Sequence, residues 1–550
     1  MTVTEAPRDA ALEAAAAPSP SAPPTGLAAV VGSGDPRTIG KLFVGTSLLF
    51  LLAAGVIGVL TGVEVYDSTG SEIFAADTLP RMVTLQATGA LFLGVLPLLL
   101  GLATAVVPLQ VGAATVAFPR ATAAAYWTWL VSGALVIAAY GIDGGPFGRD
   151  VDAVSLYVAA LVAVIVALAV ATISVVTTVA TLRAPGMTLR RTPLFSWSVL
   201  VGGSVWLLTL PVLAADLVVT WVDLRYGQQF LGGADGVWNR VAWVFWQPTL
   251  YVAAVPALGV IADVVPVFAQ RRHQRHRVAM FLIGAAAALG AGAWAQLGAS
   301  ADGSVNPADW LFEGPWIAVS FLAVVPILGL LGLWTLTLLT GRVRLGTPLV
   351  LVVPAGLLLL LGIGAGGATA VEGAGLVDTT WMTAQATLVL LGAALAGLGG
   401  VAFWAPKLYG KLLPDGVTRL GGTLVFLGAL VAAVPLAVAG TLDQARLVSG
   451  GTTTVAAGDL DTVEVLNLVS AVGLGVAVLG GLLAGLAMMA RRRGEGPGDD
   501  PWGGHTLEWA TSSPPPVGNF ASLPEITSEA PVYDARHAAA ASASTEAPAR

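Results

Sequence analysis

Long apolar segments restrict this chain to a small set of folds. Twelve of them follow one another at short intervals: 42–63, 82–109, 123–141, 154–182, 195–222, 241–267, 278–297, 310–340, 348–367, 380–404, 420–440 and 464–490. A helix of about 20 apolar residues crosses the hydrocarbon core of a bilayer. Only helices and closed barrels satisfy their own backbone polar groups there. The sequence therefore predicts an all-α polytopic membrane bundle of about twelve transmembrane helices.

The composition agrees with a membrane protein and excludes several kinds of site. Hydrophobic residues make up 56% of the chain and charged residues 11%, whereas a soluble domain carries about 25% charged residues. Cysteine is absent, which excludes disulfides and thiolate metal sites. We expect membrane lipids as partners and no nucleic acid.

Basic residues predict how the chain is organised and oriented. Three parts are expected: a disordered Ala/Pro-rich tail at 1–36, the twelve-helix domain at 37–493, and a cytoplasmic Pro-rich C-terminal tail at 494–550. Nineteen Lys and Arg residues fall on the side of the N-terminus, and five fall in the loops opposite. By the positive-inside rule, both termini are cytoplasmic.

One predicted helix pair carries unusual polar residues. Gln247 and Pro248 lie in the middle of segment 241–267, with Tyr251 one turn later, and Gln296 lies near the end of segment 278–297. Proline frees a carbonyl inside a helix, and a glutamine at membrane depth needs partners within the protein. We expect the two helices to meet over a polar pocket that contains Gln247, Tyr251 and Gln296.

Several short motifs, in the same order along the chain, resemble one known family. They are Ile39-Gly40-Lys41-Leu42-Phe43, Val107-Pro108-Leu109, Ala117-Phe118-Pro119-Arg120, Leu210-Pro211-Val212-Leu213-Ala214, Gln247-Pro248, Trp294-Ala295, Trp404-Ala405-Pro406-Lys407, Pro501 to Trp509, Pro514-Pro515-Pro516 and Asn519-Phe520. The chain resembles subunit I of the haem–copper oxidases, the catalytic subunit of cytochrome c oxidase, over roughly residues 35 to 535. This resemblance implies a bacterial plasma membrane protein of a respiratory-type complex. Fold resemblance alone does not carry function.

The resemblance also implies two haems and a copper held by histidines, which this chain does not provide. Its four histidines are His273, His276, His505 and His537, all outside the predicted membrane helices. The family's six ligand positions correspond to Gln86, Gln247, Gln296, Leu297, Gln385 and Thr387. Amides, a hydroxyl and leucine lack the imidazole donors that haem iron and copper take. We therefore expect no cofactor, no metal and no catalytic residue, with these six as vestigial ligand positions.

Other functional positions of the family are also substituted. Its haem-contacting arginine corresponds to Gly62 and its propionate-binding arginines to Asp443 and Gln444. Its proton-conducting residues correspond to Thr115, Thr249 and Leu330. Tyr251 alone is retained, at the position of a tyrosine that the family crosslinks to a histidine, and Gln247 stands in that histidine's place.

Two interpretations of the intramembrane glutamines remain open. They can hydrogen-bond across helices in place of the former ligands, or they can line a polar cavity for a small molecule or water. We expect Asp263 to pair with Arg271 or Arg272, which follow it closely. The basic cluster 271–277 fits a topology determinant, and it could also bind anionic lipid headgroups.

The leading hypothesis is a cytochrome c oxidase subunit I-like membrane protein that has lost oxygen reduction and proton pumping. It would act as a structural or regulatory subunit beside a subunit II-like or III-like protein, so the sequence leans against an enzyme. One alternative is an oxidoreductase subunit of an aerobic electron-transport chain with unorthodox cofactor ligation. Another is a membrane protein that binds a lipid or small molecule in the vacated haem pockets.

Overall fold

The computed structural model describes residues 26–66, 73–75, 78–227, 234–291, 310–371, 374–446, 459–490 and 496–546. Side chains at 27, 66, 234–248, 291, 310–313, 315, 316 and 540–546 are outside this description. The described residues are helical apart from turns, loops and one isolated bridge between Thr379 and Ala445. This confirms the predicted all-α fold class.

The long helices follow the predicted apolar segments. They are α3 (Pro36–Tyr66), α4 (Leu79–Thr88) continued by the π-helix η1 (Gly89–Val95) and α5 (Leu96–Val111), α6 (Pro119–Gly141), α7 (Val151–Thr181), α8 (Leu194–Tyr226), α9 (Ala234–Phe268), α10 (His276–Ala291), α12 (Trp310–Leu322), α13 (Val324–Thr340), α14 (Thr347–Ala368), α15 (Thr380–Tyr409), α16 (Asp415–Thr441) and α17 (Leu460–Met489). Within the described residues, eleven helices are long and apolar enough to cross a membrane, and α10 is a shorter apolar helix.

Two predicted segments differ in detail from the structure. Segment 310–340 is interrupted at Ala323, between α12 and α13, and Pro326 lies in the first turn of α13, where its missing N–H costs no helical bond. Segment 1–36 was predicted to be a disordered tail, but the short helix α2 (Leu27–Val31) lies within it. Residues 1–25 of that segment lie outside the described residues.

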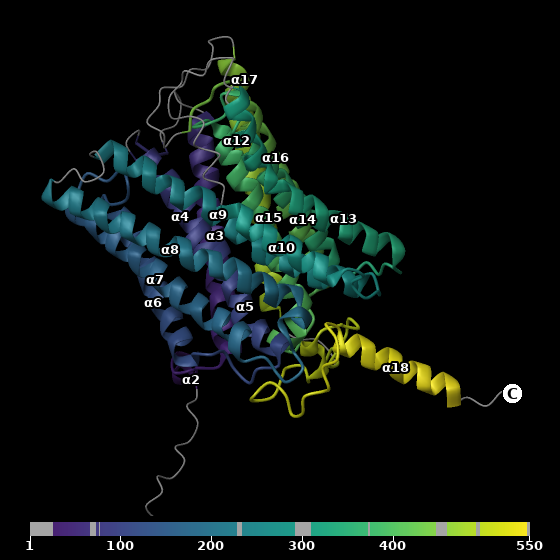
Figure 1. The fold of residues 1–550 in the computed structure, drawn as a ribbon. Coiled ribbons are helices and arrows are strands. Elements are labelled where there is room, and N and C mark those ends of the chain that lie inside the picture. The colour runs from purple at the N-terminus through teal and green to yellow at the C-terminus, as the bar shows by residue number, and fades with distance from the viewer. Residues whose placement is uncertain are drawn as a thin grey trace, which may run out of the picture.

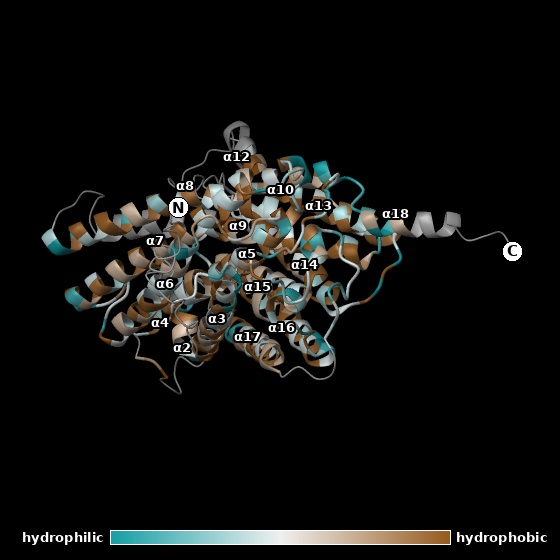
Figure 2. Cartoon of the chain, turned by 90° about the horizontal axis from the view of Figure 1, so that it is seen from below, coloured by the Kyte–Doolittle hydropathy of each residue, from teal (hydrophilic) through white to brown (hydrophobic). Residues whose placement is uncertain are grey.

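The helices differ in how much of their surface the protein covers. The segments Leu79–Val111, Thr249–Phe268 and Thr380–Tyr409 are largely buried, whereas most of α8 and α17 faces outward. Figure 1 shows α15 among its neighbours and α6, α7 and α8 together on one side of the molecule. In Figure 2, hydrophobic residues run along the helices and hydrophilic residues gather at helix ends and loops. This pattern suits a bundle surrounded by lipid.

Glycines allow α16 and α17 to pack with their backbones in contact. A Cβ atom on Gly428 would lie 2.4 Å from the backbone nitrogen of Ala477, and one on Gly473 would lie 2.3 Å from that of Ala432. Both distances are far below van der Waals contact. Membrane helices gain packing energy when small residues permit such an approach. These two glycines therefore set the distance between α16 and α17.

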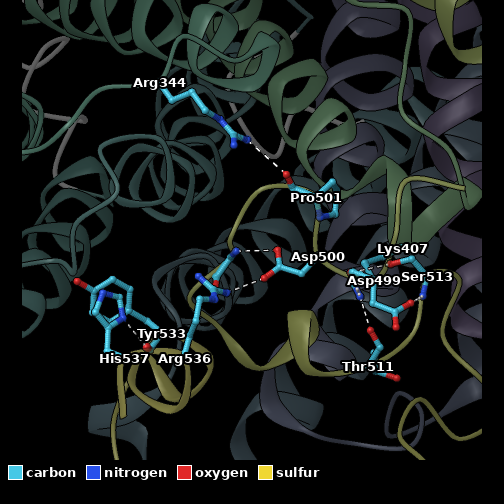
Figure 3. A network of polar contacts seen from close by, with 11 residues as sticks. Arg344, Lys407, Asp499, Asp500, Pro501, Thr511, Ser513, Tyr533, Arg536 and His537 are labelled. Carbon is cyan, nitrogen blue, oxygen red and sulfur yellow. Dashed lines mark hydrogen bonds and ion pairs between the residues drawn. The ribbon is translucent and has the colours of Figure 1, made fainter. Parts of the chain in front are cut away.

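The C-terminal segment, residues 496–546, folds against one end of the bundle. The fully buried Lys407, near the end of α15, donates from Nζ to the carbonyl oxygens of Thr511 at 2.6 Å and Asp499 at 2.9 Å. Arg536, in α18 (Pro531–Glu546), pairs with Asp500 at 2.7 Å. Figure 3 shows Lys407 joining the end of α15 to the segment and Arg536 joining α18 to Asp500 within the segment. The proline-rich stretch is thus an ordered cover over this end of the bundle, and Figure 1 shows α18 extending beyond it.

Candidate functional site

A mostly apolar cavity of about 220 Å³ lies between α3, α4, α15 and α17. Its polar lining includes the side chains of Gln86, Gln385 and Thr387, three of the six predicted ligand positions. The cavity is smaller than the range of about 300–1,000 Å³ that is common for small-molecule sites. The structure therefore brings together the predicted residues of α4 and α15 around one internal space.

Gln86 and Thr387 differ in how their polar groups are accommodated. A Cβ on Gly58 of α3 would lie 2.4 Å from Nε2 of Gln86, so the glycine makes room for the amide. The hydroxyl of Thr387 donates to the carbonyl oxygen of Thr383 at 2.8 Å. This donor is therefore satisfied within its own helix. Such a bond is a common way to carry a threonine in a membrane helix.

Gln385 and Tyr251 meet deeper in the bundle. Both are buried, with 1% and 3% of their surfaces exposed. A Cβ on Gly366 of α14 would lie 2.4 Å from Nε2 of Gln385 and 2.7 Å from the hydroxyl oxygen of Tyr251. Polar side chains of α9 and α15 thus lie against one glycine. The predicted pocket of Gln247, Tyr251 and Gln296 is untested, because the side chains of Gln247, Gln296 and Leu297 are outside the described residues.

An arginine that sequence reasoning treated only as a loop charge lies at one end of the cavity. Arg446 lines it and pairs through Nη2 with Asp378 at 2.7 Å. Its buried Nε has no hydrogen-bond partner in the structure. Gln444, at a predicted propionate-binding position, instead accepts a bond at its carbonyl oxygen from the N–H of Thr380 at 2.9 Å. Backbone hydrogen bonds of loop 442–446 hold Arg446 at the cavity. The spacing of residues in the sequence did not reveal this position.

A second buried polar cluster joins four helices, α5, α8, α9 and α15, to the C-terminal segment. Gln110 of α5, fully buried, donates to Asp263 of α9 at 2.7 Å and to Glu508 at 3.1 Å. Its oxygen accepts from the N–H of Ser196 at 3.2 Å and from its hydroxyl at 2.7 Å. Trp404 donates to Glu508 at 3.0 Å. Burial raises the pKa of the Glu508 carboxyl.

The expected pairing of Asp263 with Arg271 or Arg272 is wrong. Asp263 accepts bonds from the N–H groups of Leu194 at 3.0 Å and Phe195 at 3.2 Å. These N–H groups start α8, where a helix leaves its first donors without partners. The residue before them is Pro193, which offers no side-chain oxygen as a cap. A carboxylate from a neighbouring helix takes that role.

The histidines lie away from the membrane core. His273 and His276 flank the start of α10, His505 lies in the C-terminal segment, and His537 lies in α18. Among the described residues, no three His, Asp or Glu side chains come together in a way that could hold a metal ion. The polar groups that line the cavity are the amides of Gln86 and Gln385, threonine hydroxyls, the thioether of Met382 and the Asp378–Arg446 pair, and none of them is an imidazole. They do not fit a haem iron held by imidazole.

Three other substituted family positions, at Gly62, Thr249 and Leu330, do not line the cavity and are packed against neighbouring helices. A Cβ on Gly62 would lie 3.0 Å from the side chain of Ala471, so this glycine holds α3 close to α17. Thr249 and Leu330 are buried among neighbouring helices. Close approach of helices therefore fills part of the space that an arginine or a cofactor would require.

Comparison with solved structures places the fold among the haem–copper terminal oxidases. One chain of a haem–copper terminal oxidase dimer, solved by cryo-electron microscopy, superposes with a TM-score of 0.63 at 14% identity, over 83% of this chain and 85% of that one. The family model described as "Cytochrome C and Quinol oxidase polypeptide I" matches residues 38–476. The chain therefore belongs to this family of oxidase subunit I proteins and is a multi-pass membrane protein.

Curated relatives of similar length support this assignment. A Streptomyces avermitilis protein named "Putative cytochrome c oxidase subunit 1-beta" is 31% identical over 92% of this chain and 91% of its own. "Cytochrome c oxidase subunit 1" of Bacillus subtilis is 28% identical over 88% of this chain and 81% of its own.

Proposed function

We propose that this chain is a catalytically silent subunit I that acts as a structural or regulatory subunit of a bacterial plasma membrane complex. The observation that carries the proposal is that the chain's four histidines all lie outside its membrane helices, at 273, 276, 505 and 537. Haem iron and copper in proteins of this kind depend on imidazole ligands. Gln86, Gln385 and Thr387 correspond to ligand positions of the family, but their amide and hydroxyl groups cannot replace imidazole as a ligand of haem iron. Both termini are cytoplasmic by the distribution of basic residues.

Spectroscopy and metal analysis test the loss of redox chemistry directly. The full chain, purified in detergent, should give no haem bands in a reduced-minus-oxidised spectrum and no stoichiometric iron or copper. Cytochrome c oxidase subunit 1 of Bacillus subtilis, purified in the same way, provides the positive control. Haem at about one per chain would overturn the proposal and favour an oxidoreductase subunit with unorthodox ligation.

A structural or regulatory subunit needs a partner. The outward faces of α8 and α17 offer surface to lipid and to a subunit II-like or III-like protein. Affinity purification from the native membrane should recover such a protein in stoichiometric amount. Repeated isolation of the chain alone, in several mild detergents, would contradict this part of the proposal.

The cavity supports a second candidate, a membrane protein that holds an amphiphilic molecule. Its apolar lining suits an acyl or isoprenoid chain, and the unpartnered Nε of Arg446 suits an acidic headgroup. Native mass spectrometry should then find a retained ligand. Leu390→Trp, which fills the cavity, should expel it, whereas Leu420→Trp on the exposed face should not. A wild-type protein without any retained mass would count against this candidate.

A further inference from the structure

A large basic recess lies at the end of the bundle that carries the C-terminal segment. It has a volume of about 1,150 Å³ and is formed by three segments far apart in sequence: the loop between α7 and α8, the turn between α9 and α10, and residues 527–529. Six arginines line it: Arg183, Arg190, Arg191, Arg272, Arg275 and Arg277. Glu529 is the one acidic residue of this lining. The recess therefore carries a strong positive potential.

Three of these six arginines make ion pairs or hydrogen bonds to neighbouring protein groups, and the guanidinium groups of the other three are exposed. Arg272 pairs with Glu529 at 2.8 Å and Asp534 at 3.2 Å. Arg183 and Arg191 donate to backbone carbonyl oxygens nearby. Among the described residues, the structure shows no ion pair for the exposed guanidinium groups of Arg190, Arg275 and Arg277. These three guanidinium groups, from the loop before α8, the turn before α10 and the first turn of α10, are available to bind an anion.

Two buried imidazoles in the same recess supply an independent observation. His273 and His276 are each 9% exposed, with their ring centroids 6.4 Å apart. Both ring nitrogens of His273 and Nε2 of His276 have no hydrogen-bond partner, while the ring of His276 bonds to the backbone of Thr192. Buried polar atoms in native proteins are nearly always satisfied by protein, water or an ion. A role in setting the orientation of the helices in the membrane would explain the arginines, but it does not explain the unpaired nitrogens of the two imidazoles.

The donor set favours one anion chemistry. Burial and the neighbouring His276 lower the pKa of His273 to about 4, so its ring is neutral at pH 7 and offers a single N–H. Guanidinium groups match phosphate oxygens with paired hydrogen bonds. A phosphate presents three strong acceptor oxygens and a charge of about −1.5 to −2. Three unpaired arginines and an imidazole therefore match a phosphate ligand better than they match a carboxylate ligand, which has only two acceptor oxygens.

We propose that this recess binds a phosphate group through Arg275, Arg277 and His273. The phosphate is carried by a lipid headgroup or by a free phosphorylated molecule. When bound, it would link the turn between α9 and α10 to the first turn of α10, and Arg190 of the loop before α8 lines the same recess. This site is independent of the cavity between α3 and α15, and its test does not depend on the proposed function.

The experiment measures binding to the purified full chain by two probes. Inorganic phosphate is titrated into the protein in detergent by calorimetry. Phosphatidic acid, whose headgroup is a phosphate monoester, is titrated in phosphatidylcholine nanodiscs and followed by native mass spectrometry. Saturable binding of inorganic phosphate identifies a free ligand, and binding of phosphatidic acid alone identifies a lipid. Failure of both probes to bind overturns the proposal.

Variants separate a built site from a generally basic surface. Arg275→Gln with Arg277→Gln should weaken binding by about tenfold or more, the equivalent of one lost charged contact. Arg120→Gln with Arg342→Gln removes the same charge outside the recess and should change affinity less than about threefold. His273→Leu alters no charge at pH 7 and should also weaken binding about tenfold. Equal losses in both arginine pairs, together with none in His273→Leu, would refute a specific site. Unchanged thermal unfolding of each variant confirms that it is folded.

Discussion

Gln110→Leu offers a demanding test of the buried cluster that joins α5, α8, α9 and the C-terminal segment. The substitution preserves an apolar stem of similar length and removes four hydrogen bonds. Two of these run from Nε2 to Asp263 and Glu508, and two run from Ser196 to Oε1. Asp263 keeps its bonds from α8, and Glu508 keeps its bond from Trp404. The buried N–H of Ser196, in the first turn of α8, loses its acceptor.

The expected loss of stability is about 4 kcal/mol. It combines two hydrogen bonds to carboxylates at about 1.5 kcal/mol each with an unpaired buried N–H that costs about 1 kcal/mol. Unfolding by increasing SDS in mixed micelles, followed by tryptophan fluorescence, measures the difference. Gln274→Leu, on the exposed turn between α9 and α10, is the control and should change stability by less than about 0.5 kcal/mol.

A double-mutant cycle sharpens the same test. Ser196→Ala removes only the hydroxyl, so it should cost less once Gln110 is already leucine, with a coupling energy of about 1 kcal/mol. The reasoning is refuted if Gln110→Leu costs no more than the Gln274 control. Independent, additive losses at Gln110 and Ser196 would also contradict the bond between them.

Three further predictions concern other contacts. Gly428→Ala should destabilise the protein by about 1–3 kcal/mol in the SDS assay, because its Cβ meets the backbone of α17. Gly485→Ala, with open space around it, should be neutral or slightly stabilising. Lys407→Leu should release the C-terminal segment and speed its limited proteolysis, whereas Lys411→Leu, which removes bonds to the end of α17, should not. Burial lowers the pKa of His505 from 6.5 to about 3, so the unfolded chain binds a proton first and stability should fall as pH drops from 6.5 towards 3. His505→Gln should flatten that decline in a pH series of melting temperatures, and an unchanged slope would contradict it.

The apolar pattern predicted the fold because span length is set by the thickness of the bilayer. Segments such as 154–182 and 464–490 correspond closely to α7 and α17. The interruption at Ala323 had a local signal in Pro326, which a hydropathy pattern overlooks. The π-helical turn Gly89–Val95 contains two glycines and is followed by Pro97, but a hydropathy pattern does not distinguish such a turn from an α-helix.

Contacts between distant residues were harder to predict than the helices. Asp263 was assigned to Arg271 or Arg272 because they are close in sequence, but its partners come from the start of α8, about 70 residues away. Two interpretations of Gln86 and Gln385 were left open, hydrogen bonds across helices or the lining of a polar cavity, and only coordinates reveal the glycines that lie against both amides. Packing across helices depends on shape, which a single sequence does not report.

The contacts of the C-terminal segment have a consequence for biogenesis. Asn519 donates from Nδ2 to the carbonyl oxygen of Ala113 at 2.8 Å, and Arg37 bonds to the carbonyl oxygen of Pro515. The helices translated first therefore remain uncovered at this end of the bundle until residues 515 to 519 have been made. A chain whose synthesis stops before Glu508 would still insert its membrane helices. Its Gln110 and Trp404 would then lack the carboxylate to which they donate. We therefore expect a chain that lacks this segment to be cleaved by proteases faster than the full chain, because this end of its bundle is uncovered.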